Sequence, residues 1–374
     1  MISVMYDNQV FLRQGRGGIS RYFVELIKHW HSAPQLGVVP ILDHSWTMNE
    51  MAATAGLGRL VPQIGGRRIA ARLNPLLASG LNSLTNRLPI EGNPDIVHYT
   101  QYSKKAFKSN GAHLNACTVY DMIPERFPDL FPAGNPHKDK QFFVESCDLI
   151  ICISESTRQD LEHFYGKVEG QVVVVPLGVG APFSESESPP DTRSVEPWLP
   201  REAFALFVGN RPHYKAFSLA LEAMERANDR PMTLLAVGGG RLTAEDKEQI
   251  ATKAPSIHVQ HEYLSDAQLA VAYSHASMFL FPSHYEGFGL PTLEAMALGC
   301  PVLVPYTSSH IEVAGNAGTF FEDGNSDDLA SGIERIYTDS KLREAMVEQG
   351  KRRVCDFTWG QCVEKTALAY RGAM

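Results

Sequence analysis

The chain has 374 residues, 44% of them hydrophobic, which is long enough to predict two domains with substantial cores. A formal net charge of −8 argues against a general nucleic-acid-binding protein, because such proteins are usually basic. The six cysteines form no Cys-x-x-Cys pair, the first residues lack the pattern of a secretory signal, and no run reaches the roughly 18 apolar residues of a membrane span. We therefore expect a reduced, cytoplasmic protein without a zinc site.

Short β-branched runs alternate with amphipathic helical patterns in the first half of the chain. Strands are predicted at residues 2–6, 95–99, 116–120, 148–154 and 171–176. Helices are predicted at 19–30 and 155–166, the second of them with Ser154 as its N-cap. Several of the strands are continuously apolar, which is typical of a parallel sheet covered on both faces.

A stretch rich in serine, proline and acidic residues follows, and we predict a linker at 186–200. Beyond it the alternation resumes, with a helix from Lys215 to Ala227 and strands predicted at 204–209, 232–240, 256–260, 278–282 and 301–305. The predicted fold class is therefore α/β, with two facing Rossmann-like, doubly wound parallel-sheet domains at 1–185 and 201–357. Ligands of such sheets bind outside the carboxyl ends of the strands, so the cleft between the domains is the expected site.

The string HYEGFGLPTLEAMALG, which begins at His284, follows the apolar strand predicted at 278–282 and combines a glycine turn with a predicted helix. The turn would let backbone N–H groups approach phosphate oxygens beside the positive end of the helix. Glu294, expected in the first helical turn after Pro291, would accept hydrogen bonds from a ribose diol. Glu286, on the other side of the turn, would reach the sugar beyond the diphosphate. The alternative is that Glu294 only complements the helix dipole and that Glu286 is a solvated acid in a loop.

The string FVGNRPHYKAF at 207–217 places Arg211 and Lys215 where a strand gives way to a helix. Fixed cations there would stabilise the negative charge that a nucleotide diphosphate gains as it leaves a sugar. An ordinary basic loop is the alternative. Because the sequence has no Asp-x-Asp motif of the kind that holds a divalent ion in many sugar transferases, neither a metal nor another cofactor is expected.

Three features of the first half could also contact ligands. The Gly-Gly turn of RQGRGGISRYFVEL lacks the dinucleotide fingerprint, but it fits a loop that closes over a diphosphate held mainly by the other domain. Asp121 follows an apolar strand and would face the cleft, or it initiates a turn or caps a helix. His98 also ends a strand, where it contacts the acceptor or has a structural role.

Taken together, these strings resemble the retaining glycosyltransferases of family 4, which have the GT-B architecture, and among them bacterial polysaccharide mannosyltransferases. Glu286 and Glu294 match the family's Glu-x7-Glu pair, which implies that Glu294 holds the ribose and Glu286 the hydroxyls of the donor sugar. The resemblance also implies that Arg211 and Lys215 bind the diphosphate. It also implies donor contacts from Gly17, Gly18, Gly209, Asn210, Tyr263, Leu264, Gly287, Phe288, Gly289 and Leu290. The segment 358–374 resembles the helix that crosses back onto the N-terminal domain.

One position departs from the family pattern. Many members carry His-Asp where this chain has Tyr120 and Asp121, and that histidine commonly touches the donor sugar. A catalytic role is therefore not carried over to Tyr120, which we place with His98 among the acceptor contacts. Asp121 stays a catalytic candidate for binding the sugar or the acceptor.

The predicted function is transfer of a sugar, with retention, from a nucleotide-diphosphate sugar to a hydroxyl of a growing glycan or lipid-linked saccharide in surface polysaccharide biosynthesis. GDP-mannose is the first candidate donor and UDP-sugars are the next. The alternatives are a sugar-nucleotide epimerase, a phosphorylase, for which no pyridoxal-phosphate lysine signal is present, and a two-domain solute-binding protein.

An acid-free stretch at 51–90 suggests a second kind of contact. It contains five arginines mixed with leucines, so Arg67, Arg68 and Arg72 could lie on an anionic membrane surface at the inner face of the membrane. The alternative is a helix pair that packs inward and leaves scattered arginines on the surface.

Overall fold

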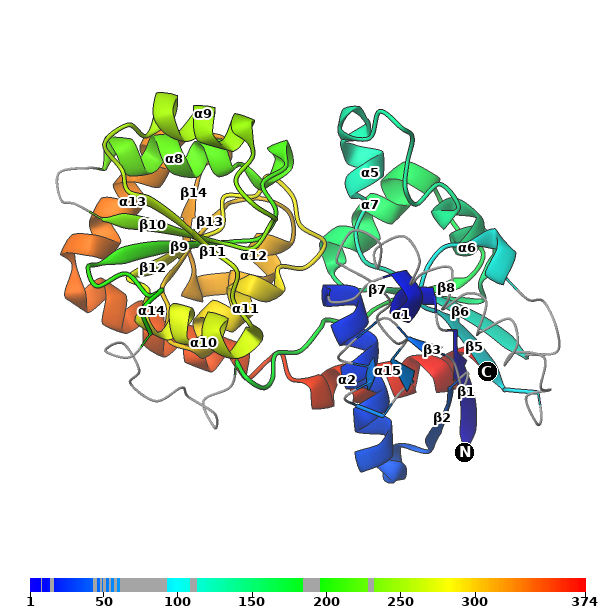
Figure 1. Ribbon diagram of the computed structural model, residues 1–374. Helices are drawn as coiled ribbons and strands as arrows, with labels where there is room; N and C mark the ends of the chain where they lie inside the picture. The colour runs from blue at the N-terminus through cyan, green and yellow to red at the C-terminus, as the bar shows by residue number, and fades with distance from the viewer. Residues whose placement is uncertain are drawn as a thin grey trace. The chain divides into compact units, whose positions relative to one another are not determined.

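The computed structural model divides the chain into two compact units. Unit 1 comprises Met1–Leu177 together with Trp359–Met374, and unit 2 comprises Gly178–Thr358 (Figure 1). The residues that the structure describes are 1–7, 9–13, 17–42, 46–47, 49, 52–53, 55–56, 59–60, 93–107, 113–183, 196–227 and 232–374. Arg67, Arg68 and Arg72 lie outside them. No helix in these ranges combines the length and apolar character needed to cross a bilayer.

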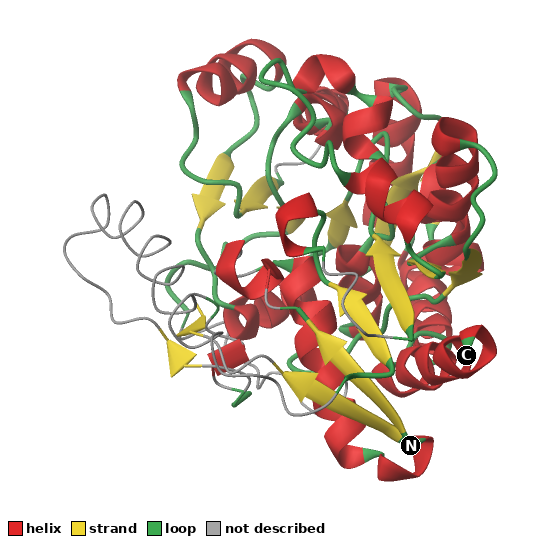
Figure 2. Cartoon of the chain, turned by 90° about the vertical axis from the view of Figure 1, so that its right-hand side faces the viewer, coloured by secondary structure: helices red, strands yellow, loops and turns green. Residues whose placement is uncertain are grey.

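Unit 1 contains a six-stranded parallel sheet with helices packed against its strands (Figure 2). Its strand order is β2-β1-β5-β6-β7-β8. The strands are β1 (Ile2–Tyr6), β2 (Val38–Leu42), β5 (Ile96–Tyr99), β6 (Leu114–Val119), β7 (Leu149–Cys152) and β8 (Gln171–Val174). Two further short strands, β3 (Trp46–Thr47) and β4 (Arg59–Leu60), pair with each other.

The helices of unit 1 come from both ends of the chain. They are α1 (Gln9–Arg13), α2 (Gly18–Ser32), α5 (Ile123–Arg126), α6 (Lys140–Ser146), α7 (Glu155–Tyr165) and α15 (Trp359–Ala373), with 3-10 turns at Pro34–Leu36, Lys104–Ala106 and Pro128–Leu130. Ser154 caps α7 through a bond from the Thr157 N–H, as predicted. Tyr370 on α15 lies 3.0 Å from the Tyr6 hydroxyl, to which Trp30 donates at 2.8 Å. The last helix is thus part of the core of unit 1.

Unit 2 contains a second six-stranded parallel sheet, in the order β11-β10-β9-β12-β13-β14. The strands are β9 (Phe204–Val208), β10 (Thr233–Val237), β11 (Val259–Glu262), β12 (Met278–Leu280), β13 (Val302–Pro305) and β14 (Thr319–Phe321). The helices are α8 (Phe217–Arg226), α9 (Ala244–Lys253), α10 (Asp266–His275), α11 (Leu290–Ala297), α12 (Ser308–Ala314), α13 (Ser326–Thr338) and α14 (Ser340–Val354), with 3-10 turns at His213–Lys215 and Gly315–Ala317. The two sheets confirm the predicted α/β class.

Side chains of the central strands alternate between two buried cores in unit 2. In β9, Ala205 and Phe207 join the core beneath α8 and α13, whereas Phe204 and Leu206 join the core beneath α10 and α11. Both faces are covered, which explains why such strands are continuously apolar in the sequence.

The boundary between the units lies earlier than the predicted linker. Unit 2 begins at Gly178, so the predicted boundary at 185 falls inside it. Phe183, Trp198 and Leu199 pack against the core of unit 2, although they flank or belong to the stretch assigned to the linker. The polar composition of this stretch indicated a linker, but it did not reveal that the apolar residues at its two ends pack into unit 2.

Candidate active site

The carboxyl ends of β9 and β12 meet at the centre of the second sheet. The chain runs from β9 through β10 to β11 on one side and from β12 through β13 to β14 on the other. Its direction across the sheet therefore reverses between β9 and β12, and such a switch point is where open α/β sheets bind ligands. The loop after β9 carries Arg211 and Lys215, and the loop after β12 carries Glu286.

Lys215 and Glu286 form an ion pair between these two loops. Lys215 ends the 3-10 turn after β9, and its ammonium contacts Oε1 of Glu286. The two side chains are only 15% and 11% exposed, so salt screens their attraction less than at an open surface. The ammonium also lies 5.1 Å from the centre of the Phe281 ring. The structure thus brings together two of the four side chains predicted to be catalytic.

A third segment, after β13, holds the loop that carries Glu286. Ser308 Oγ accepts a hydrogen bond from the Glu286 N–H at 3.3 Å, and Ser309 Oγ donates to the Glu286 carbonyl at 2.9 Å. His310 is fully buried, and its Nε2 donates to the Ser283 carbonyl at 3.0 Å. Burial lowers the pKa of His310 to about 4, so the ring is neutral at pH 7.

Sequence reasoning missed these three residues. The available signal was a pair of hydroxyl side chains shortly after the apolar strand PVLVP. Their role depends on the pairing of β12 with β13, which brings two distant loops to the same edge of the sheet.

The glycine turn after Glu286 leads directly into α11. Gly289 caps this helix at φ +101°, a left-handed conformation that favours glycine. Pro291 lies in the first turn, as predicted. The Phe288 ring is buried and packs edge-on against Phe357, so it belongs to the core of unit 2. Contacts of Gly287, Phe288, Gly289 and Leu290 with a donor stay predictions.

Glu294 lies further along α11 than the sequence indicated. The helix begins at Leu290, so Glu294 is its fifth residue and opens the second turn. The prediction that it lies in the first turn is wrong. Its side chain is buried, and the Tyr273 hydroxyl on α10 donates to Oε2 at 3.4 Å. A ribose contact of this carboxylate stays a prediction.

Arg211 is engaged by the protein itself. Its side chain is 3% exposed, its Nε lies 3.2 Å from Oδ2 of Asp246, and its terminal nitrogens donate to the carbonyls of Gly238 at 2.8 Å and Gly240 at 2.9 Å. Burial raises the pKa of Asp246, but hydrogen bonds from Thr243 and Arg211 outweigh it and hold this pKa below its usual value. The Arg211 guanidinium therefore holds the turn that follows β10. To bind a diphosphate, it would have to give up some of these hydrogen bonds, and that contact stays a prediction.

The clamped turn requires glycine at its centre. Gly238, Gly239 and Gly240 all have positive φ, at +84°, +72° and +76°. A Cβ on Gly239 would lie 2.7 Å from the carbonyl oxygen of Gly209 and 2.8 Å from Cα of Asn210. The turn after β10 thus packs directly on the backbone that leads from β9 to Arg211.

The remaining predicted donor contacts of unit 2 also follow its strands. Gly209 has φ +129° and Asn210 is exposed directly after β9. Tyr263 follows β11 with 59% of its surface exposed, and Leu264 packs against the core. These positions are at the carboxyl edge of the sheet, and their contacts with a donor stay predictions.

In unit 1, Gly17 caps α2 and Gly18 is its first residue. The Gly17 carbonyl accepts bonds from the Arg21 N–H at 3.0 Å and from Ser20 Oγ at 2.9 Å. The helix begins within one residue of the predicted position. Closure of this turn over a diphosphate stays a prediction.

His98 and Tyr120 have structural roles rather than the predicted contact with an acceptor. His98 is fully buried, with Nδ1 2.6 Å from the Tyr370 hydroxyl and Nε2 2.8 Å from Thr118 Oγ1. Burial lowers its pKa to about 3. The Tyr120 ring is 7% exposed, and its hydroxyl donates to the Thr100 carbonyl at 2.9 Å. Both side chains are enclosed because the strand ends are covered by residues from distant parts of unit 1.

Comparisons with known proteins identify the family of each part of the chain. Residues 16–181 match the family described as Glycosyltransferase Family 4, and residues 190–353 match Glycosyl transferases group 1. Over 370 residues the chain is 25% identical to the O-antigen chain mannosyltransferase B of Escherichia coli, covering 95% of this chain and 96% of that protein.

Solved structures share the fold. Sucrose-phosphate synthase from Thermosynechococcus elongatus superposes with a TM-score of 0.75 at 18% identity, covering 99% of this chain and 98% of that one. Anabaena Alr3699/HepE, solved in complex with UDP and glucose, superposes with a TM-score of 0.72 at 14% identity over the whole of both chains. The chain therefore belongs to the glycosyltransferases, with a family 4 domain followed by a group 1 domain on the GT-B architecture.

Proposed function

We propose that the protein moves a sugar from a nucleotide-diphosphate sugar to a hydroxyl of a growing glycan or lipid-linked saccharide, with retention at the anomeric carbon and without a metal ion. The observation that carries this proposal is the pairing of Lys215 with Glu286 at the switch point of the second sheet, beside the start of α11. A cation, a carboxylate and a helix N-terminus at one place can bind the charged and the hydroxylated parts of such a donor.

In the proposed reaction the bond between the anomeric carbon and the diphosphate oxygen breaks while the acceptor oxygen bonds to the same face of that carbon. The acceptor proton passes to an oxygen of the leaving diphosphate, so no protein nucleophile is needed. Lys215 would exchange part of its contact with Glu286 for a diphosphate oxygen and stabilise the charge that develops there. Glu286 would then bind hydroxyls of the sugar and hold it in line.

Mannose is the proposed sugar, and GDP-mannose the first donor to test. This choice is supported by the similarity to a mannosyltransferase that covers 95% of the chain. UDP-sugars are the second choice. Surface polysaccharide is the proposed product, made at the cytoplasmic side of a membrane, with Arg67, Arg68 and Arg72 as the proposed contact with anionic lipids.

The first test is a thermal-shift screen with GDP, UDP, ADP and their sugars, because a ligand that binds only the folded state raises its melting temperature. The ligand that raises it most is then incubated with and without a saccharide acceptor. Transfer with an α-linked product from an α-linked donor, unaffected by EDTA, supports the proposal. An altered donor sugar formed without any acceptor would instead identify an epimerase, and binding without turnover a solute-binding protein.

A further inference from the structure

Unit 1 contains a buried ion pair that the proposed reaction does not use. Lys140 begins α6 with its side chain 1% exposed, and its Nζ lies 2.8 Å from Oε2 of Glu125, whose side chain is 8% exposed. Removing two charges from water is costly, and an apolar pair of similar volume is often at least as stable. Such a pair is therefore weak support for stability, and its geometry suggests another role.

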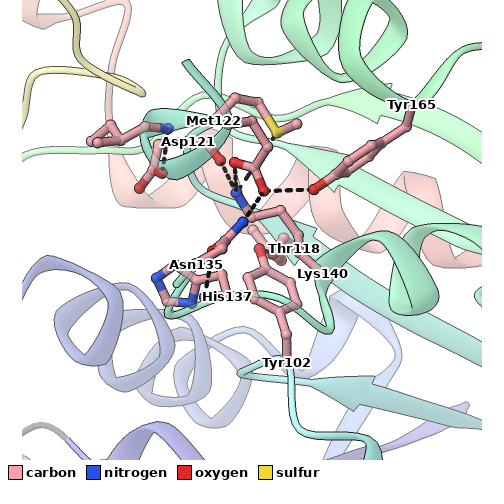
Figure 3. Close-up of polar contacts among 10 residues, drawn as sticks. Tyr102, Thr118, Asp121, Met122, Asn135, His137, Lys140 and Tyr165 are labelled. Carbon is pink, nitrogen blue, oxygen red and sulfur yellow. Dashed lines mark hydrogen bonds and ion pairs between the residues drawn. The ribbon is translucent and has the colours of Figure 1, made fainter. Parts of the chain in front are cut away.

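The Lys140 ammonium binds a single short segment of chain. Besides Glu125 it donates to the backbone carbonyl of Asp121 at 2.8 Å, and it lies 3.7 Å from Sδ of Met122. Asp121 and Met122 join β6 to α5, and Glu125 lies in α5 itself, so one contact with backbone and two with side chains hold the segment that follows β6 (Figure 3). A lysine with three donors can hold such a segment from one side.

Glu125 is held in turn by two other elements. Its Oε1 accepts hydrogen bonds from the Tyr165 hydroxyl of α7 at 2.6 Å and from Nδ2 of Asn135 at 3.0 Å. Burial raises the pKa of Glu125, but the charge of Lys140 and these hydrogen bonds outweigh it and hold this pKa below its usual value. The carboxylate is therefore ionised at neutral pH, and the segment after β6 is tied to α6, α7 and the loop before α6.

Asp121 lies in this fixed segment with one carboxylate oxygen available. Its Oδ1 accepts a hydrogen bond from the Ile123 N–H at 3.0 Å, which is the turn role that the sequence left open. Its Oδ2 has no hydrogen-bond partner among the residues that the structure describes. The residue is half-buried at the carboxyl end of β6, the edge of the sheet at which ligands bind.

We infer that Lys140 is a positioning residue that fixes the turn after β6, so that Oδ2 of Asp121 accepts a hydrogen bond from a hydroxyl of the saccharide acceptor. This inference rests on the proposed function, because it assigns the acceptor of that reaction. Lys140 itself touches no substrate and acts through Asp121.

The test uses the full chain with the double variant Lys140→Met/Glu125→Leu, which replaces the ion pair by apolar side chains of similar size. We expect it to fold and to bind the nucleoside diphosphate as the wild type does, while KM for the acceptor rises about tenfold or more, as for a lost charge-assisted hydrogen bond. Asp121→Asn should give a similar increase, and adding it to the double variant should give little more, because the two changes act on one contact. The matched control, Arg158→Met/Glu155→Leu, removes a more exposed ion pair from α7 and should leave KM unchanged.

An unchanged KM for the acceptor in a folded double variant would mean that the ion pair is only structural. If that variant fails to fold, Asp121→Asn decides, because it keeps the ion pair, and an unchanged KM again overturns the inference. Failure of the wild type to transfer sugar from any donor is a different result, seen before any variant is made, and it would overturn the proposed function and the inference together.

Discussion

The Lys215 ammonium and the Glu286 carboxylate contact each other across the switch point of the second sheet. Each residue comes from a loop that follows a different strand, and the backbone of one loop bonds to the other, because the His284 N–H donates to the Tyr214 carbonyl at 2.8 Å. The pair is therefore set in place by neighbouring strands rather than by the flexible reach of a lysine. Its charge is balanced before any donor binds.

Replacing Lys215 by methionine should lower kcat at least about 100-fold, because the loss of one preorganised charge at a developing anion has effects of this size. The dissociation constant for the nucleoside diphosphate should change much less, since the backbone of the glycine turn remains. Steady-state kinetics and calorimetry give the two quantities. Lys247→Met, on the exposed face of α9, is the control, and an equal effect of both variants on kcat would remove Lys215 from the reaction.

Glu294→Gln should weaken nucleoside diphosphate binding about tenfold, the loss expected for a charge-assisted hydrogen bond to ribose. The sharper readout compares ribose and deoxyribose forms of the same nucleotide. Wild type should prefer the ribose form and the variant should lose most of that preference. Glu248→Gln on α9 should bind both forms as the wild type does. A variant that keeps the full preference would leave Glu294 with a role in packing against α10.

Arg211→Lys should destabilise unit 2 by about 2–4 kcal/mol, because a single ammonium cannot replace the fork that binds Asp246 and the carbonyls after β10. Denaturant unfolding of this unit measures the change. If Arg211 also binds the diphosphate, saturating nucleotide should stabilise the variant less than the wild type. If nucleotide stabilises the variant and the wild type equally, Arg211 only holds the turn after β10 and does not bind the diphosphate.

Gly239→Ala and Gly240→Ala form a matched pair. Both positions have similar positive φ, so each alanine costs about 1–2 kcal/mol in backbone strain. Only the Gly239 methyl would lie 2.7 Å from a backbone oxygen, whereas no atom lies within 4 Å of the Gly240 methyl. Gly239→Ala should therefore destabilise unit 2 clearly more than Gly240→Ala does, and equal melting temperatures would contradict the packing of this turn on Gly209.

The strands in the middle of each sheet were the most predictable part of the fold. β7 and β9 are buried on both faces, so their apolar runs are visible in the sequence without any tertiary information. Of the four edge strands of the two six-stranded sheets, β8 and β11 were predicted, whereas β2 and β14 were not. β2 is interrupted by Pro40 and β14 has only three residues, so neither shows a clear strand pattern in the sequence.

The candidate site was predictable where a charged residue lies in the loop that follows an apolar strand. Lys215 and Glu286 lie in such loops, and their charges indicated the chemistry. Ser308 and Ser309 were missed because their contact with Glu286 depends on which strands are neighbours. His98 was assigned to the acceptor because position at a strand end does not reveal burial, which here comes from Tyr370, 272 residues away.

Unit 1 should lose stability as the pH falls from about 6.5, the usual pKa of an unfolded histidine, towards 3, the folded pKa of His98. In this window the unfolded chain binds a proton that the folded chain does not, so the free energy of unfolding falls by up to about 1.4 kcal/mol for each pH unit. In His98→Gln, the free energy of unfolding should depend less steeply on pH between pH 4 and 6, by the contribution of about one proton, and its dependence above pH 7.5 should not change. An unaltered slope at low pH would mean that His98 is protonated in the folded protein.

The placement of α15 in unit 1 has a consequence for how the protein is made. Unit 2 is one continuous segment, whereas unit 1 needs Tyr370 from the last helix to complete its bonds with Tyr6 and His98. A ribosome therefore delivers every residue of the second half before the first half has its final helix. The unit that is synthesised first is therefore completed last. While the ribosome translates unit 2, the incomplete core of unit 1 has to be protected by chaperones or by its own partial stability.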